Sequence, residues 1–326
     1  MVNCNNYDKI IISIIIPVYN EEKNIPILYD RIISVMNKKV KEPYEIIFVD
    51  DGSIDNSLQI LRELKIRDSR VRYISFSRNF GHQIAICAGF EAAQGKAIVS
   101  MDGDLQHPPE LLPQIIAKWH EGYQIVSPIK DDVKVLPFFK HWLTVVFYAL
   151  IRRISNLKLT FGASDFRLLD RVVVDALRNM PEKRKFLRGL VDWTGYKSVN
   201  LPYKLEKRYA GKPKYTYGRM FRLAFDAIFS FSLTPLRVVF WLGIITSSFC
   251  FLYAIFITIV IMFDIRSLIY RNIVVPGWLS IMIGILFLGG IQLVGIGMLG
   301  EYIGRVYEET QNRPLYLIKE VSDDKF

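Results

Sequence analysis

With 326 residues, 51% of them hydrophobic, the chain is long enough for one large domain or two smaller ones. Its 42 lysine and arginine residues against 32 acidic ones give a net charge of +10, which suits anionic lipid or phosphorylated ligands. Nucleic acid is excluded as the expected partner, and a zinc site or disulfide framework is not indicated, because zinc-finger spacing, RNA-binding signatures and Cys-x-x-Cys pairs are lacking.

The first part of the chain alternates between strand and helix patterns. A nearly unbroken β-branched run at Ile10–Ile16 and a second apolar run at Tyr44–Val49 predict buried strands. Three further strands are expected at Val71–Ser75, Ala97–Met101 and Tyr123–Ser127, with helices between them. This alternation predicts an α/β fold, a mostly parallel sheet flanked by helices on both faces.

Acidic residues follow three of the expected strands. They are Glu21 and Glu22, Asp50 and Asp51, and Asp102 and Asp104. Because open α/β sheets bind ligands at the carboxyl ends of their strands, we expect these side chains to converge on one edge. The spacing of Asp102 and Asp104 suits a hard divalent cation that takes further ligands from phosphates. Taken alone, this Asp-x-Asp pattern fits a polar turn that caps a helix equally well, and the three acidic strand ends together favour the site.

The segment after the fifth strand has a different pattern. The uncharged run within Leu136–Arg153 is too short to cross a bilayer, so it fits either an amphipathic helix against the membrane or a core helix. Further on, Asp165 and Arg167 lie between apolar neighbours, which is unusual for a plain loop.

A strongly basic segment with interleaved tyrosines covers Leu201–Arg222. Such a charge run is usually a solvated face. Here it directly precedes a membrane segment, so a surface that binds headgroups or phosphates is the better interpretation.

Two uncharged stretches, at about residues 238–263 and 273–300, are long enough to cross a bilayer. Basic residues gather before the first and after the second, which predicts that both termini are cytoplasmic. Glycines in the second stretch permit close helix packing, within the hairpin or between subunits.

These features describe a transfer reaction. An acidic site that can bind a metal suits a diphosphate-bearing donor, because the cation neutralises charge on the leaving group. A basic strip beside the membrane suits an anionic acceptor in lipid. Serine-hydrolase, P-loop and dinucleotide-binding signatures do not occur in the sequence.

Four motifs, in order and at typical separations, resemble family 2 glycosyltransferases. They are Pro17–Glu21, Val49–Ser53, Asp102–Glu110 and Asp165–Arg167. Within that family the chain resembles the polyprenyl-phosphate glycosyltransferases, which include dolichol-phosphate mannose synthase. The C-terminal stretches Gly300–Arg305 and Arg313–Tyr316 are similar to those of bacterial undecaprenyl-phosphate glucosyltransferases of O-antigen (lipopolysaccharide) modification. The resemblance extends from about Ile11 to Leu317.

The resemblance implies a glycosyltransferase A-type catalytic domain at residues 1–215, on the cytosolic side. An amphipathic interfacial helix is expected at 216–236, a transmembrane hairpin at 237–301, and a cytosolic tail at 302–326. The expected setting is the bacterial inner membrane, with a multi-pass chain, a cytosolic active site and a homo-oligomeric assembly.

The resemblance also implies roles for individual residues. Donor binding would involve Pro17, Tyr19, Glu21, Asp50, Asp51 and Asp102. Mg²⁺ or Mn²⁺ would be held by Asp102, Asp104 and Gln106. Asp165 takes the position proposed for a catalytic base, with Arg167 beside it, although an acceptor phosphate is already largely ionised near neutral pH and Asp165 is open to a purely orienting role. The acceptor phosphate would contact Lys130, Arg208 and Lys214.

We therefore expect an enzyme that transfers one hexose with inversion, glucose from UDP-glucose, to undecaprenyl phosphate. Its partners would be the nucleotide sugar, the polyprenyl phosphate and membrane lipid. The same chemistry with GDP-mannose or a UDP-linked amino-pentose is the alternative, and a non-catalytic membrane protein that senses nucleotide sugars is a further one. Processive synthases of the family carry a Gln-x-x-Arg-Trp motif, which this sequence lacks.

Overall fold

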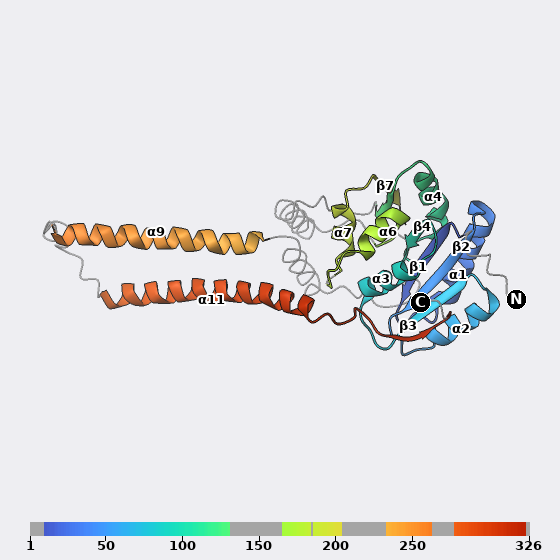
Figure 1. The fold of residues 1–326 in the computed structure, drawn as a ribbon, viewed down its shortest axis with the longest axis horizontal. Coiled ribbons are helices and arrows are strands. Elements are labelled where there is room, and N and C mark those ends of the chain that lie inside the picture. The colour runs from blue at the N-terminus through green and yellow to red at the C-terminus, as the bar shows by residue number, and fades with distance from the viewer. Residues whose placement is uncertain (1–9, 131–164, 184, 204–232, 263–276, 324–326) are drawn as a thin grey trace. The chain divides into compact units, whose positions relative to one another are not determined.

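The computed structural model describes residues 10–130, 165–183, 185–203, 233–262 and 277–323. The chain forms two compact units. We call Met1–Ala227 together with Arg313–Phe326 the α/β unit, and Ile228–Asn312 the apolar unit. Figure 1 shows the elements of each, whose relative placement is not determined.

The α/β unit is built on an eight-stranded sheet with the order β7-β5-β6-β4-β1-β2-β3-β8. Its strands are β1 (Ile12–Val18), β2 (Tyr44–Asp50), β3 (Val71–Phe76), β4 (Ala97–Ser100), β5 (Ile125–Lys130), β6 (Arg167–Asp170), β7 (Ser198–Tyr203) and β8 (Ile318–Val321). The neighbours β4, β1, β2 and β3 run parallel, as do β5 and β7. β6 is antiparallel to β4 and β5, and β8 is antiparallel to β3. The expected mostly parallel sheet is confirmed.

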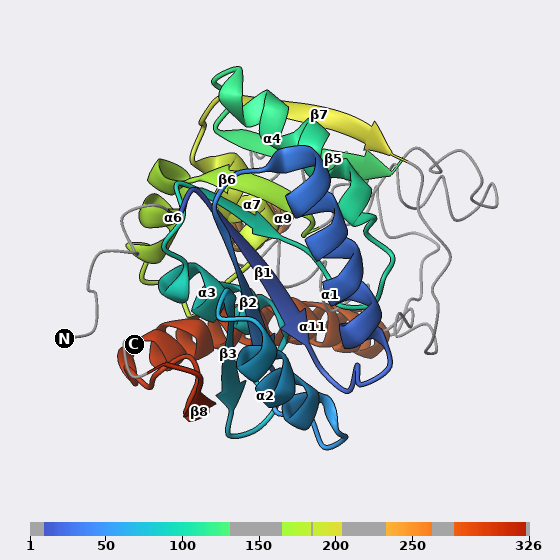
Figure 2. The same cartoon turned by 90° about the vertical axis from the view of Figure 1, so that its right-hand side faces the viewer.

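Helices cover both faces of this sheet, as the sequence predicts. They are α1 (Asn24–Val35), α2 (Ser57–Arg67), α3 (His82–Ala92), α4 (Leu112–His120), α6 (Arg171–Arg178) and α7 (Leu187–Trp193), with a π-helical turn at Met36–Val40 and a 3₁₀ turn at Pro109–Leu111. Figure 2 shows α1, α2 and α4 over one face, with α3 and α6 on the other side. The turns after β1, β2 and β4 therefore lie at the carboxyl edge of a sheet that is packed on both sides.

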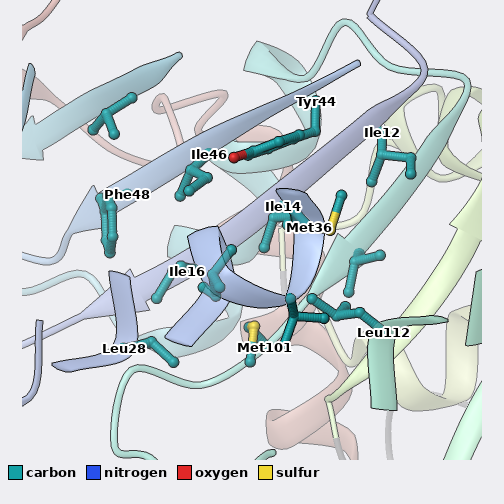
Figure 3. Packing of buried hydrophobic residues seen from close by; sticks show 14 of the residues in the cluster. Ile12, Ile14, Ile16, Leu28, Met36, Tyr44, Ile46, Phe48, Met101 and Leu112 are labelled. Carbon is teal, nitrogen blue, oxygen red and sulfur yellow. The ribbon is translucent and has the colours of Figure 1, made fainter. Parts of the chain in front are cut away.

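The buried core explains why β1 and β2 are mostly apolar. Ile12, Ile14 and Ile16 of β1 point into the cluster with α1 and α4, which Figure 3 shows in close view. Ile15 points the other way, toward Gly89 of α3, where an added Cβ would collide with the isoleucine side chain. Because both faces of β1 are buried, each isoleucine contributes about 1.5–3 kcal/mol of burial free energy. The central strands are thereby a rigid base for the turns at their ends.

Three strands were not expected from the sequence, namely β6, β7 and β8. β6 begins at Arg167, two residues after Asp165, so Asp165 lies in the bend that leads into a strand inside the sheet. β8 comes from the segment expected to be a separate cytosolic tail at 302–326. The structure instead extends the last helix to Thr310 and assigns Arg313 onward to the α/β unit, where β8 completes the sheet beside β3.

The apolar unit contains two long helices, α9 (Thr234–Met262) and α11 (Gly277–Thr310). By length and composition, each contains a stretch that could cross a membrane, Thr234–Tyr253 and Ile281–Thr310. A Cβ added at Gly295 of α11 would lie only 3.2 Å from Val239 Cγ1 of α9, so this glycine permits a close approach within the unit. The expected helix at 136–153 lies outside the described residues, as do residues 216–232 of the interfacial helix expected at 216–236. Its last three residues belong to α9, which begins at Thr234.

Candidate active site

The turns after β1 and β2 are joined to each other by hydrogen bonds. The Asn20 amide donates to Ser53 Oγ at 2.9 Å, and Asn20 Oδ1 accepts from the amide of Ile54 at 2.9 Å. One residue further on, the Glu21 amide donates to Ser57 Oγ at 2.9 Å. Gly52 has φ +72°, a left-handed conformation that favours glycine, in the middle of the second turn. The predicted donor-binding segments Pro17–Glu21 and Asp50–Asp51 therefore form one preorganised surface at the carboxyl edge.

The two aspartates after β2 have internal partners. Asp50 Oδ1 accepts from the Ser53 amide at 2.9 Å and Oδ2 accepts from the Ser75 hydroxyl at 2.7 Å. Asp51 accepts from the amides of Phe80 and Gly81 just before α3. Burial raises the pKa of Asp51, although these amide hydrogen bonds oppose the shift. Both carboxylates thus fix the turns around the site, and sequence reasoning did not foresee this use.

The loop after β4 carries the predicted metal ligands. Asp104 Oδ1 accepts from the Gln106 amide at 3.1 Å, which closes a tight turn. Leu105 between them has φ +63°, and its buried side chain belongs to the core cluster. A bulky residue in this left-handed region is unusual, so the core contact holds the turn against backbone strain. The three predicted ligands Asp102, Asp104 and Gln106 are thereby held on one short, fixed loop.

His107 ties this loop to the strand beside it. Its Nδ1 accepts from the amide of Asp102 at 3.2 Å, and its buried ring stacks on Phe166 with 4.9 Å between centroids. Since Phe166 follows Asp165, the stack links the aspartate loop to Asp165.

Asp165 is buried and held by several donors. Arg188 of α7 contacts both carboxylate oxygens, Nε to Oδ1 and Nη2 to Oδ2, each at 3.0 Å. Gln83 Nε2 of α3 donates to Oδ2 at 3.0 Å. Burial disfavours the charge, but Arg188 and His82 outweigh it and hold the pKa of Asp165 well below its ordinary value. Asp165 is therefore held as an anion whose two oxygens already accept hydrogen bonds from the chain.

His82 lies between two of the predicted site residues. Its Nε2 is 3.2 Å from Asp102 Oδ1 and 3.6 Å from Asp165 Oδ2. Partial burial opposes the charged imidazole, yet the two carboxylates prevail and raise the pKa of His82 to about 10. For Asp102, burial is likewise outweighed, by His107 and His82, and its pKa is lowered. His82 was not among the predicted site residues.

The other predicted residues are distributed as follows. Arg167 is buried on β6, and burial lowers its pKa. Lys130 is the last residue of β5, in register with Tyr203 of β7. Arg208 and Lys214 lie outside the described residues. The acceptor-phosphate contacts thus stay predictions.

Sequence reasoning missed three side chains at this edge: His82, Gln83 and Arg188. The available signals were weak, namely the scarcity of histidine, with four in the chain, and the position of His82 just after a glycine at a helix start. Nothing in the sequence near Arg188 marks it as a site residue, because its partner Asp165 comes earlier in the chain, with β6 and α6 between them.

A divalent cation fits the oxygen chemistry of the loop. Carboxylate and amide oxygens are the ligands that Mg²⁺ and Mn²⁺ prefer. Among the described residues, no group of three His, Cys, Asp or Glu side chains could hold a metal on its own. A cation here would therefore need the Gln106 amide and oxygens of a bound ligand.

Comparison with known proteins now adds to this geometry. The family described as "Glycosyl transferase family 2" matches residues 13–178. The uncharacterized glycosyltransferase YkcC of Bacillus subtilis is 44% identical over 308 residues, which cover 94% of this chain and 93% of the relative. The "Prophage bactoprenol glucosyl transferase homolog" of Escherichia coli is 40% identical, over 95% of this chain and 99% of the relative. The "Bactoprenol glucosyl transferase" of Shigella phage SfII is 39% identical, over 94% of this chain and 97% of the relative.

The matched family region includes β1 to β6 with the acidic turns at their carboxyl ends, and the relatives match nearly the whole chain. The expected glycosyltransferase A-type fold class is confirmed. The chain belongs to glycosyltransferase family 2, in the group that includes the bactoprenol glucosyl transferases, and it is a glycosyltransferase.

Proposed function

We propose that this enzyme transfers a single glucose from UDP-glucose to a polyprenyl phosphate, undecaprenyl phosphate, with inversion at the anomeric carbon. The observation that carries the proposal is the 40% identity, over 95% of the chain, to a relative named for bactoprenol glucosyl transfer. Bactoprenol is a polyprenol, and the match includes the apolar helices as well as the α/β unit.

The acceptor phosphate supplies the nucleophile in this reaction. Its oxygen attacks the anomeric carbon of the donor sugar, and the bond from that carbon to the donor diphosphate breaks with its electron pair on the departing nucleoside diphosphate. A phosphate monoester has a second pKa of about 6, so the attacking oxygen is already ionised near neutral pH. The reaction therefore needs no protein base.

Asp165 supports this scheme, because its oxygens already accept from Arg188 and Gln83. It acts as a positioning residue that holds the first turns of α3 and α7 together. Arg167, buried beside it in the chain, contributes positive charge behind the site.

The donor is bound at the carboxyl edge of the sheet. Pro17, Tyr19, Glu21, Asp50 and Asp51 form the surface for its base and ribose. Asp102, Asp104 and Gln106 would hold Mg²⁺ or Mn²⁺, which would neutralise charge on the departing diphosphate. The fixed turn at Leu105 supports this assignment, because it keeps the ligands in place before the donor arrives.

The acceptor would bind at the membrane. α9 and α11 are long and apolar enough to anchor the chain there, and we propose a bacterial inner membrane with both termini and the site cytosolic. Lys130, Arg208 and Lys214 would contact the acceptor phosphate. The glycines of α11 suit packing between subunits, so we propose a homo-oligomer.

Purified full-length protein, labelled nucleotide sugars and undecaprenyl phosphate test this function. With Mg²⁺ or Mn²⁺ and UDP-glucose, mass spectrometry should find the acceptor heavier by one hexose, and NMR should find an inverted anomeric centre. A preference for GDP-mannose or a UDP-amino-pentose would show that UDP-glucose is not the donor. Retention of the anomeric configuration would refute the inverting step. Binding without transfer from any donor would instead support a nucleotide-sugar sensor.

A further inference from the structure

His82 stands at the solvent side of the acidic site. It is the first residue of α3, and its Nε2 contacts Asp102 at 3.2 Å and lies 3.6 Å from Asp165. The imidazole side chain is 42% exposed, whereas the side chain of Asp165 is 8% exposed. The ring therefore covers Asp165 and remains accessible to a ligand.

The backbone around His82 is fixed on both sides. Gly81 has φ +108°, and its amide and that of Phe80 donate to Asp51. Gln83 donates to Asp165 and accepts from the amide of Leu187 at 3.2 Å. The turn and the first residues of α3 thus hold the ring in place, although the ring itself is not packed in the core. A histidine that served only stability would gain more from burial.

The Nε2 atom carries a proton in this arrangement. Its two neighbours are carboxylate oxygens, which accept hydrogen bonds, so Nε2 is the donor in the neutral ring as well as in the charged one. A bound nucleotide sugar would engage Asp102 and leave this N–H free for a new acceptor. The other cation beside Asp165 is less available, because Arg188 contacts that carboxylate through both Nε and Nη2.

We propose that His82 is a catalytic residue that donates a hydrogen bond from Nε2 to an anionic phosphate oxygen of a bound substrate. This inference rests on the proposed function. The partly exposed carboxylate of Asp102 repels phosphate, so an accessible N–H beside it would offset that repulsion. The oxygen belongs to the donor diphosphate or to the acceptor phosphate. In either case the proton stays on Nε2 while the anomeric carbon exchanges one phosphate oxygen for the other.

A hydrogen bond to the departing diphosphate strengthens as charge develops on it, and one to the acceptor phosphate aligns the nucleophile. The first source predicts a fall in kcat and weaker binding of the nucleoside diphosphate product. The second predicts a higher KM for polyprenyl phosphate with unchanged binding of that product.

The test compares His82→Ala, His82→Gln and His82→Lys in the full-length protein. We expect kcat/KM to fall by roughly 10²–10³-fold in the alanine variant, as for the loss of one donor to a transition-state oxyanion. The lysine variant, which keeps a cationic donor, should retain more activity than the alanine variant. Because the ring is partly exposed, added imidazole should enter the space in His82→Ala and restore part of the rate.

His120→Ala is the matched control. That histidine also contacts a carboxylate, Glu42 at 2.7 Å, and is 52% exposed, but it ends α4 away from the acidic turns. Its removal should leave transfer unchanged. Isothermal titration of the nucleoside diphosphate with Mn²⁺, and KM values for each substrate, separate the two sources of phosphate.

The outcomes are distinct. A wild-type protein that transfers sugar, together with a His82→Ala variant within threefold of its kcat/KM, overturns the role of His82. Loss of activity in all three variants without rescue by imidazole or lysine also overturns it, because a structural role alone explains that result. No transfer by the wild-type protein contradicts the proposed function itself.

Discussion

Two groups of charged side chains lie at opposite ends of the same parallel strands. The amino-end cluster comprises Ser13, Glu45, Arg72 and Asp323. Glu45 accepts from Ser13 at 2.6 Å and pairs with Arg72 Nη1 at 2.8 Å, and Arg72 Nε pairs with Asp323 at 3.2 Å. Arg72 also donates to the carbonyl oxygen of Ala92 at 3.0 Å. Its members near the strand starts are closed off from solvent, with Glu45 2% and Arg72 7% exposed.

The carboxyl-end cluster comprises His82, Gln83, Asp102, Asp165 and Arg188. Its inner part resembles the first cluster, because a buried carboxylate pairs with an arginine, here through two hydrogen bonds. Its outer part differs, since Asp102 and His82 are partly exposed. The same residue types thus stabilise the fold where they are buried and paired with one another. They offer a binding site where some of them are still exposed to solvent.

The largest expected effect is the loss of stability on breaking the ion pair in the amino-end cluster. Arg72→Met leaves the Glu45 charge buried without its partner, and breaking a buried ion pair in this way costs about 3–5 kcal/mol of unfolding free energy. Denaturant unfolding of the full chain in detergent measures the loss. Adding Glu45→Gln should recover part of it, because the unpaired charge is gone.

Arg178→Met serves as the control, because Arg178 is 41% exposed and lies 3.6 Å from the exposed Asp175. Its effect should stay within about 0.5 kcal/mol. An Arg72→Met protein as stable as this control would show that the amino-end cluster is not the stabilising one.

The second effect concerns the open edge. Asp104→Asn keeps an oxygen for the Gln106 amide but removes the charge expected to face a cation. We expect sugar transfer to fall by roughly 10²–10³-fold, with the unfolding free energy nearly unchanged. Assays at several Mg²⁺ and Mn²⁺ concentrations, and after chelation with EDTA, provide the measurement. Unchanged transfer with either cation would remove the metal role of Asp104.

Much of this edge follows from the sequence. The apolar runs of β1 and β2, each interrupted by a single polar residue near its start (Ser13 and Glu45), predict buried parallel strands, and parallel strands end at one edge. Acidic residues just after such strands therefore predict a ligand site. The sequence pattern does not show which group each charged side chain contacts. Asp50 and Asp51 look like ligands in the sequence, yet they accept hydrogen bonds from their own chain.

Long-range pairing explains the remaining misses. β8 has four residues, and its partner β3 lies in the first quarter of the chain, far away in the sequence, so no local period reveals the pair. In the sequence, Arg188 cannot be told apart from an exposed arginine of any helix. Only the insertion of β6 beside β4 brings Asp165 within its reach.

The third expected effect is a loss of stability at the carboxyl-end cluster that depends on pH. Arg188 and His82 outweigh burial and lower the pKa of Asp165 below its unfolded value of about 3.9. A lowered pKa stabilises the fold above the unfolded pKa, and this contribution is lost as the pH falls through the folded pKa. Asp165→Asn should therefore cost about 1.5–3 kcal/mol at pH 7, the strength of hydrogen bonds to a charged group. The difference from wild type should shrink below about pH 4.

Asp175→Asn is the comparison for that pH series, because Asp175 is 49% exposed on α6. Its effect should be small at every pH. A stability difference for Asp165→Asn that stays constant from pH 7 to pH 3 would contradict the lowered pKa of Asp165.

The smallest effect lies at the rim of the amino-end cluster, where β8 meets α2. Arg62 Nε donates to Glu320 Oε1 at 2.9 Å, and Tyr73 donates to the same oxygen at 2.6 Å. Because the Arg62 side chain is 43% exposed, solvent screens the pair, and Glu320→Gln should cost only about 0.2–1 kcal/mol. Asp323→Asn should cost more, since its partner Arg72 is buried, and unfolding of both variants in detergent measures the difference. Equal losses would mean that β8 is held by its backbone pairing with β3 rather than by the buried arginine.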